Sequence, residues 1–143
     1  MTPTEGVDYQ SWTGGFAKTI CRYHFWDTSG ADDDGAVSMR RPYYEGITGF
    51  WIIYDVTNRQ SFQSVNKWHQ SIQLYKSAGS EPMVRLFANK CDLSDKRTVS
   101  NVEGHQVAIS LGMSYREISA KTEFGVSELR GRWAPSFTMV SES

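Results

Sequence analysis

Cysteine is scarce in this chain. Cys21 and Cys91 are its two cysteines, and they lie far apart without forming a Cys-x-x-Cys pair. No signal-peptide pattern follows Met1. These absences argue against a disulfide-stabilised secreted domain and predict a reducing, cytoplasmic setting.

Long hydrophobic runs are lacking as well. The longest extends from Phe50 to Tyr54, far short of the roughly 20 residues that a membrane-spanning helix needs. Residues 138–143 contain no cysteine that could be prenylated. We therefore expect no direct membrane anchor.

Neither sign of charge dominates the sequence. Fifteen basic and 16 acidic residues give a formal net charge of −1, and the basic residues are scattered. A nucleic-acid or anionic membrane surface is therefore not an expected partner. The 143 residues are 39% hydrophobic and 22% charged, which is typical of one soluble globular domain. We expect residues 1–143 to form a single domain and a monomer.

Two short apolar runs predict buried strands. Gly49 to Asp55 and Met83 to Ala88 have the continuous pattern of strands that are covered on both faces of a parallel sheet. The segment between them is predicted to be a helix after a cap at Ser61. Its apolar residues recur at helical spacing: Phe62, Val65, Trp68, Ile72 and Tyr75.

The strand–helix–strand order then repeats. Ser100 and Glu103 have the spacing of a capping box, Gly112 ends the helix, and Ser114 to Ile118 is predicted to be the next strand. Two successive crossovers predict an α/β fold with a mostly parallel open sheet and flanking helices.

The two ends of the chain have weaker patterns. Val7 to Trp12 and Lys18 to Trp26 are rich in strand-forming residues and predict an antiparallel pair around Gly14-Gly15. A helix is predicted to start at Val126, but Gly131 and Pro135 should cut it short.

Polar residues follow the predicted strands, where an open α/β sheet binds its ligands. Asn89-Lys90-Cys91-Asp92 follows the strand that ends at Ala88, and Ser119-Ala120-Lys121 follows the strand that ends near Ile118. A carboxylate can accept from N1 and the exocyclic amine of guanine while a backbone amide donates to O6, and adenine cannot match this pattern. The residues predicted to bind guanine are Asn89, Lys90, Asp92, Ser119, Ala120 and Lys121.

With these motifs the sequence resembles the Ras superfamily, most closely its Rab branch. Thr4 to Tyr9 is similar to the start of the second Rab strand, and Trp26-Asp27-Thr28-Ser29-Gly30 is similar to the Rab WDTAG motif. Asp55 to Phe62 is similar to the family segment that opens the helix after the fourth strand. The resemblance runs from Thr4 to about Leu129, and its motifs keep the family's order.

The resemblance implies a small GTPase-like fold that binds GTP or GDP with Mg²⁺, hydrolyses GTP and acts in vesicle transport through protein effectors and regulators. Thr4 and Asp27 would contact magnesium, and the Gly30 amide would contact the terminal phosphate. Tyr9, Trp26 and Tyr44 would present an aromatic patch to effectors.

The resemblance also gives each guanine-binding residue a role. Asp92 would select guanine and Asn89 would brace the two loops. Lys90 would pack along the base and ribose, and Ala120 would donate its amide to O6.

The sequence departs from the family at the phosphate site. It contains no Gly-x-x-x-x-Gly-Lys-Ser/Thr loop, and Met1 precedes Thr4 by three positions. We therefore expect an N-terminally incomplete Rab-like GTP-binding domain that lacks the first strand, the P-loop and the first helix, and that binds nucleotide and Mg²⁺ weakly. The missing strand would leave two apolar sheet edges with unpaired backbone groups.

Two further departures concern single residues. Ala31 stands where the family has the glutamine that positions the attacking water, so hydrolysis is expected to be impaired and no catalytic residue is assigned. Arg85 interrupts an apolar run and is expected to face a sheet edge exposed to water, because an unpaired buried guanidinium is costly.

Some residues and the function as a whole also have simpler interpretations. Asp32-Asp33-Asp34-Gly35 is better explained as a solvated switch loop than as a calcium site, because Gly30 and Arg41 would fall at ligand positions. His24, His69 and His105 are dispersed and predict surface or packing roles. The alternative functions are a catalytically inactive, nucleotide-independent interaction protein and a truncated fragment without a role of its own.

Overall fold

The computed structural model describes residues 7–16, 19–28, 44–126 and 137–141. Thr4, Gly30, Ala31 and the segment Asp32–Gly35 lie outside the described residues, so the expectations attached to them stay predictions.

The described strands form a six-stranded sheet in the order β1-β2-β6-β3-β4-β5. Strands β1 and β2 pair antiparallel, and every other neighbouring pair is parallel. The predicted α/β class is therefore confirmed. The strands are β1 (Val7–Phe16), β2 (Thr19–Thr28), β3 (Gly49–Asp55), β4 (Met83–Asn89), β5 (Ser114–Glu117) and β6 (Phe137–Ser141).

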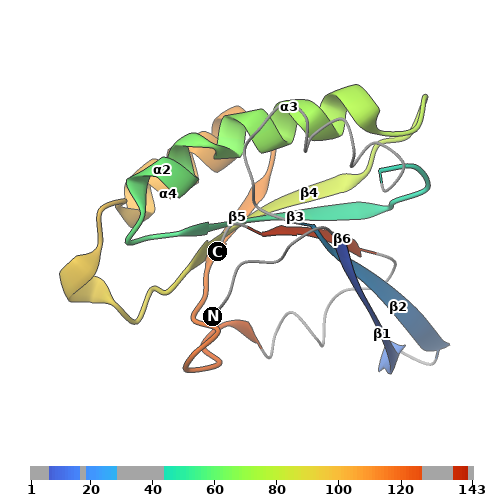
Figure 1. Ribbon diagram of the computed structural model, residues 1–143, viewed down its shortest axis with the longest axis horizontal. Helices are drawn as coiled ribbons and strands as arrows, with labels where there is room; N and C mark the ends of the chain where they lie inside the picture. Colours follow the sequence, from blue (N-terminus) through green and yellow to red (C-terminus); the bar gives the residue numbers. More distant parts are fainter. Residues whose placement is uncertain (1–6, 17–18, 29–43, 127–136, 142–143) are drawn as a thin grey trace.

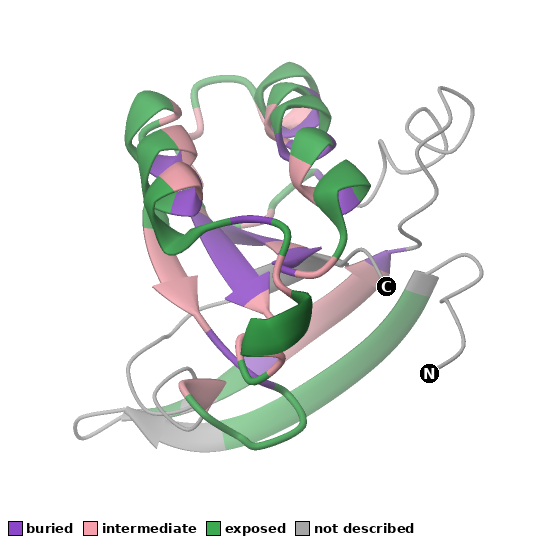
Figure 2. Cartoon of the chain, turned by 90° about the vertical axis from the view of Figure 1, so that its left-hand side faces the viewer, coloured by how far each residue is buried: buried purple, intermediate pink, exposed green. Residues whose placement is uncertain are grey.

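The described helices lie together over one face of the sheet (Figure 1). They are α2 (Arg59–Gln63), α3 (Val65–Tyr75) and α4 (Asn101–Ser110), and a short 3₁₀ turn, η2 (Ser94–Lys96), precedes α4. Figure 2 shows that β3 and the inward sides of the helices are largely buried, whereas the described part of β1 is exposed.

Alternation along β3 divides the core into two clusters. Phe50, Ile52 and Tyr54 face the helices and pack in one cluster with Val65 and Trp68. Trp51 belongs to a second, smaller cluster with Phe87 and Ile118. Successive side chains of a strand point to opposite faces, so β3 is covered on both sides, as its continuous apolar run predicted.

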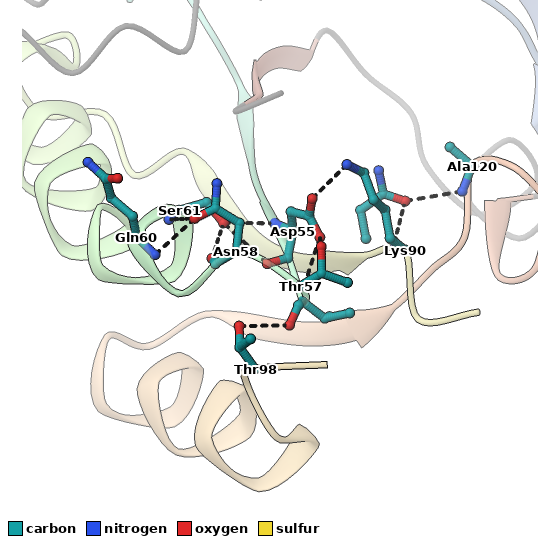
Figure 3. Close-up of polar contacts among 10 residues, drawn as sticks. Asp55, Thr57, Asn58, Gln60, Ser61, Lys90, Thr98 and Ala120 are labelled. Atoms are coloured by element: carbon teal, nitrogen blue, oxygen red, sulfur yellow. Dashed lines mark hydrogen bonds and ion pairs between the residues drawn. The ribbon is translucent and has the colours of Figure 1, made fainter. Parts of the chain in front are cut away.

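The start of the first helix differs from the prediction. Asn58, not Ser61, is the cap: its Oδ1 accepts from the amides of Gln60 at 3.0 Å and Ser61 at 3.3 Å (Figure 3). Ser61 is buried, and its hydroxyl donates to the Asn58 carbonyl oxygen and accepts from the Asp55 amide. Asn58 takes the cap because its backbone is still extended, so its side chain can reach the first free amides.

The predicted limits of α4 are confirmed. Ser100 and Glu103 form a reciprocal capping box, with the Glu103 amide donating to Ser100 Oγ and the Ser100 amide donating to Glu103 Oε2. Gly112 follows the helix with φ +69°, a left-handed conformation that glycine adopts without steric cost.

The antiparallel pair near the N-terminus is confirmed, but its turn was predicted at the wrong place. Gly14 and Gly15 lie inside β1, opposite Cys21 and Ile20. Both strands are longer than predicted. Aromatic pairs support the hairpin before the glycines, such as Trp12 beside Tyr23 at 5.0 Å between ring centroids.

The expectation of two unpaired sheet edges was wrong. Strand β6 lies between β2 and β3 and pairs with both in parallel, so that Met139 is opposite Asp27 on one side and Trp51 on the other. Strand β6 takes this position because backbone amides and carbonyls in the middle of a sheet must be paired. A segment from the other end of the chain supplies those partners (Figure 1).

The expected exposure of Arg85 was also wrong. Its strand β4 lies between β3 and β5, and the residue is only 8% exposed. Its guanidinium donates to the Met83 sulfur, at 2.8 Å from Nη2. Burial and the nearby charge of Arg116 lower the pKa of Arg85 to about 10, so the side chain still carries its charge at neutral pH.

Candidate functional site

The two predicted loops start side by side because their strands are neighbours. In the pairing of β4 with β5, Ala88 is opposite Glu117. The β4 loop (Asn89–Leu93) and the β5 loop (Ile118–Thr122) follow directly. The Cys91 amide donates to the Ile118 carbonyl oxygen at 3.2 Å, which ties the backbones of the two loops together.

Asn89 links the β4 loop to the β5 loop through its side chain. Its Oδ1 accepts from the Ala120 amide at 3.1 Å and from the Lys90 amide at 2.8 Å. Figure 3 shows the Ala120 amide directed back toward the β4 loop. Asn89 therefore braces the two loops. Its Oδ1 accepts the same Ala120 N–H that was predicted to donate to guanine O6.

Asp92 and Ser119 form the second link between the loops. The Ser119 hydroxyl donates to Asp92 Oδ1 at 2.6 Å and accepts from the Thr122 amide at 3.2 Å. Ser119 is fully buried, whereas Asp92 is exposed. The bond therefore fixes the orientation of a solvent-facing carboxylate, whose Oδ2 has no donor among the described residues.

Lys90 forms an ion pair with Asp55, a residue that was not among the predicted site residues. Its backbone has φ +63°, and its Nζ lies 2.6 Å from Asp55 Oδ2 (Figure 3). Asp55 Oδ1 accepts from both the amide and the hydroxyl of Thr57. Burial raises the pKa of Asp55, but the hydrogen bonds from Lys90 and Thr57 outweigh it, so the pKa is lower than usual.

A pocket of about 400 Å³ opens between the two loops. Of the residues predicted to bind guanine, only Asp92 lines it. Its other lining residues are Cys91, Glu117, Thr122 and Phe124. Burial raises the pKa of the Cys91 thiol, and the nearby carboxylates of Glu117 and Asp92 raise it further, so this cysteine is not an activated nucleophile.

Few residues of the predicted phosphate and magnesium site can be placed. Asp27 lies near the end of β2, opposite Asp8 of β1 and Met139 of β6. Within the described part of the chain, no group of three or more histidine, cysteine or acidic residues could hold a metal ion. The described residues therefore offer a single predicted magnesium contact, and they do not by themselves form a magnesium site.

Two of the three residues predicted to form an aromatic patch lie side by side. Tyr9 is 45% exposed and its ring centroid lies 4.7 Å from that of Trp26 on the neighbouring strand. Tyr44, however, is completely buried and stacks on Phe50, so its assignment to an exposed patch was wrong. It lies just before β3, and its ring fills the core under α3, where Tyr75 also contacts it.

Comparison with known protein families shows which family this chain belongs to. The family model described as Ras family matches residues 1–134. The chain belongs to the Ras family.

Among individual relatives of this Ras-family chain, the Ras-related protein Rab-8B of Bos taurus is 34% identical over 125 residues, which are 87% of this chain and 58% of the relative. Rab-8B of Homo sapiens gives the same values. Rab-8A of Mus musculus is 33% identical over 123 residues, covering 86% of this chain and 58% of the relative. The chain thus spans less than two thirds of the length of these proteins.

In this Ras-family chain, the structure describes all six residues predicted to bind guanine, but of the three residues predicted to contact phosphate and magnesium it describes Asp27 alone. No helix in the described part of the chain is long and apolar enough to cross a membrane.

Proposed function

We propose that this chain binds a guanine nucleotide through its β4 and β5 loops, in the manner of a Rab-like small GTPase. The observation that carries the proposal is the bond from buried Ser119 to exposed Asp92, which orients a solvent-facing carboxylate whose second oxygen has no donor in the described part of the chain. A fixed carboxylate can accept both N1–H and the 2-amino group of guanine. Ser119 fixes the carboxylate directly, and Asn89 holds the two loops together through the Ala120 amide.

Recognition of guanine O6 needs a change in one hydrogen bond. The Ala120 amide already donates to Asn89 Oδ1 at 3.1 Å. O6 would share this N–H with Asn89 or take it over. The Asn89 side chain is part of the brace, so its own position depends on whether a base is bound.

Lys90 would contact the base and the ribose in this proposal. Its ammonium is anchored to Asp55 at 2.6 Å, which places its alkyl chain across the start of the β4 loop. This position is suited to packing along a base and ribose. Lys121, which is exposed, would close the opposite side.

The cellular role we propose is that of Rab proteins, GTP-dependent control of vesicle transport. Thr4, Asp27 and Gly30 would contact magnesium and phosphate. Without a Gly-x-x-x-x-Gly-Lys-Ser/Thr loop in the sequence, binding should be weak, and with Ala31 in place of the water-positioning glutamine, hydrolysis should be slow.

Calorimetry on the purified chain tests the base-binding proposal. Asp92→Asn replaces a carboxylate oxygen with an amide donor and should weaken GDP binding by about 10- to 100-fold, the value of a hydrogen bond to a charged group. Asp95→Asn is the matched control, because it removes the same charge from the exposed turn η2. ADP binding as tight as GDP binding, or an unchanged GDP affinity in Asp92→Asn, would refute guanine recognition. Submicromolar GTP affinity of the unaltered chain would refute the weak-binding expectation alone.

A nucleotide-independent interaction protein is the second candidate, and the exposed aromatic hairpin favours it. Tyr9 stacks on His24 and makes a tilted ring contact with Trp26, and Trp12 is 42% exposed further along the same strand. Such rings are common in protein interfaces. Partner binding that survives Asp92→Asn but is lost in Tyr9→Ala would support this candidate over nucleotide control.

A further inference from the structure

A bidentate ion pair lies directly behind the two loops. Arg97 Nη1 is 2.7 Å from Glu117 Oε1, and Nη2 is 3.2 Å from Oε2. The side chains are only 22% and 21% exposed. This parallel, two-bond geometry is the strongest form of an arginine–carboxylate contact, and it fixes the direction of both groups.

Other polar groups hold the pair in place. Arg97 Nη1 also donates to the Val99 carbonyl oxygen at 3.1 Å, and the Tyr115 hydroxyl donates to Glu117 Oε1 at 3.3 Å. Tyr115 in turn contacts the hydroxyl of Tyr54 at 3.3 Å. Burial raises the pKa of Glu117, but the hydrogen bonds from Arg97 and its other partners keep it below the ordinary value. Glu117 is therefore charged at neutral pH.

The positions of the pair in the chain connect it to the guanine loops. Glu117 is the last residue of β5 and precedes Ser119 by two positions, while Arg97 follows Asp92 by five. The ion pair and the Ser119–Asp92 hydrogen bond therefore close a ring that contains the end of the β4 loop, the turn η2 and the start of the β5 loop. If the Arg97–Glu117 pair is removed, the Ser119–Asp92 hydrogen bond is the remaining link of this ring.

We propose that Arg97 and Glu117 are positioning residues for guanine recognition, which set the direction of the Asp92 carboxylate through Ser119 without touching the base. The inference rests on the proposed function. It adds two residues that the sequence-based prediction of the guanine site did not include.

The chain contains a matched control pair. Arg59 Nη2 lies 2.7 Å from Glu103 Oε1, but these side chains are 47% and 38% exposed. This pair joins the first turns of α2 and α4 and touches neither loop. The same substitutions in the two pairs remove the same charges and differ in their relation to the base site.

The substitutions are Arg97→Met and Glu117→Gln, with Arg59→Met and Glu103→Gln as controls. GDP and IDP affinities are measured for each, because hypoxanthine lacks the 2-amino group that Asp92 accepts from. A general loss of stability weakens both ligands equally. A misdirected carboxylate lowers the preference for GDP over IDP.

We expect the preference of the unaltered chain for GDP over IDP, about tenfold or more for one hydrogen bond to a charged group, to fall to about onefold in Arg97→Met and Glu117→Gln. The double variant should be no worse than either single variant, because the two residues act as one unit. Arg97→Lys, which keeps the charge without the fork, should recover part of the preference. A preference that persists in Arg97→Met would overturn the proposal.

Hydrogen exchange separates this outcome from failure of the proposed function. If the unaltered chain binds neither GDP nor IDP, guanine recognition itself has failed. The positioning role is then decided on the nucleotide-free chain by the amides of Cys91, Ala120 and Thr122, which bond across or within the loops. These amides should exchange faster in Arg97→Met and not in Arg59→Met. Equal protection in both variants would refute the role.

Discussion

Gly104 on α4 offers a sharp test of how tightly the helix layer packs on the sheet. An alanine Cβ at this position would lie 2.5 Å from the Tyr54 hydroxyl oxygen and 2.6 Å from Cε2 and the hydroxyl oxygen of Tyr115. Tyr54 is completely buried, so its ring has no open space to turn into. Helix α4 can approach the sheet this closely because the residue has no side chain.

Two opposing effects set the magnitude for Gly104→Ala. Alanine in a helix is favoured over glycine by about 1 kcal/mol. Overpacking costs about 1–3 kcal/mol, and displacement of the Tyr54–Tyr115 hydrogen bond costs about 1 kcal/mol more. We therefore expect a net loss of about 1–3 kcal/mol in the free energy of unfolding.

Urea denaturation followed by tryptophan fluorescence measures this loss. Gln106→Ala, at an exposed position of the same helix, controls for helix propensity and should be nearly neutral. In a Tyr54→Phe background the closest contact is gone, so Gly104→Ala should cost less. A Gly104→Ala chain as stable as the unaltered one would show that the tyrosine rings move aside and that the packing argument is wrong.

Two further predictions concern the pair behind the loops and the strand β6. Because the pKa of Glu117 is lower in the folded chain than its usual 4.5, its contribution to stability is present above that value and is lost as the pH falls through the folded pKa. Urea denaturation at pH 7 and pH 3.5 should therefore show a smaller acid-induced loss in Glu117→Gln, and an unchanged loss would contradict the pKa assignment. Met139→Pro removes a backbone donor from a strand that pairs on both sides, so the amides of β2 should exchange about tenfold faster while those of β4 keep their protection. Equal loss in β2 and β4 would show that β6 does not act as a separate link between the hairpin and the rest of the sheet.

The predicted guanine-binding residues could be found from sequence because their signal is local. Asn89 to Asp92 and Ser119 to Lys121 each follow an apolar run, and the two crossovers predict that these runs end at one edge of a sheet. The structure places the loops together and joins them through Asn89 and Ser119. Their binding of guanine remains our proposal.

The residues that support these loops left no comparable signal. Asp55 was visible only as the end of a strand, and its contact with Lys90 depends on the left-handed backbone at that lysine. Arg97 and Glu117 are separated by 20 residues, and any other arginine and glutamate in the sequence would give the same pattern. Contacts of this kind depend on distances that the sequence does not encode locally.

The sequence by itself determined the α/β class, the strands β3, β4 and β5, the capping box of α4 and the order of the Rab-like motifs, because hydrophobic periodicity and capping act over a few residues. Tertiary structure alone decided that Tyr44 and Arg85 are buried and that β6 fills the centre of the sheet. These outcomes depend on what other parts of the chain can cover or pair. Unpaired amides and carbonyls at a strand edge can bond to any segment that lies beside them, however far away that segment is in the sequence.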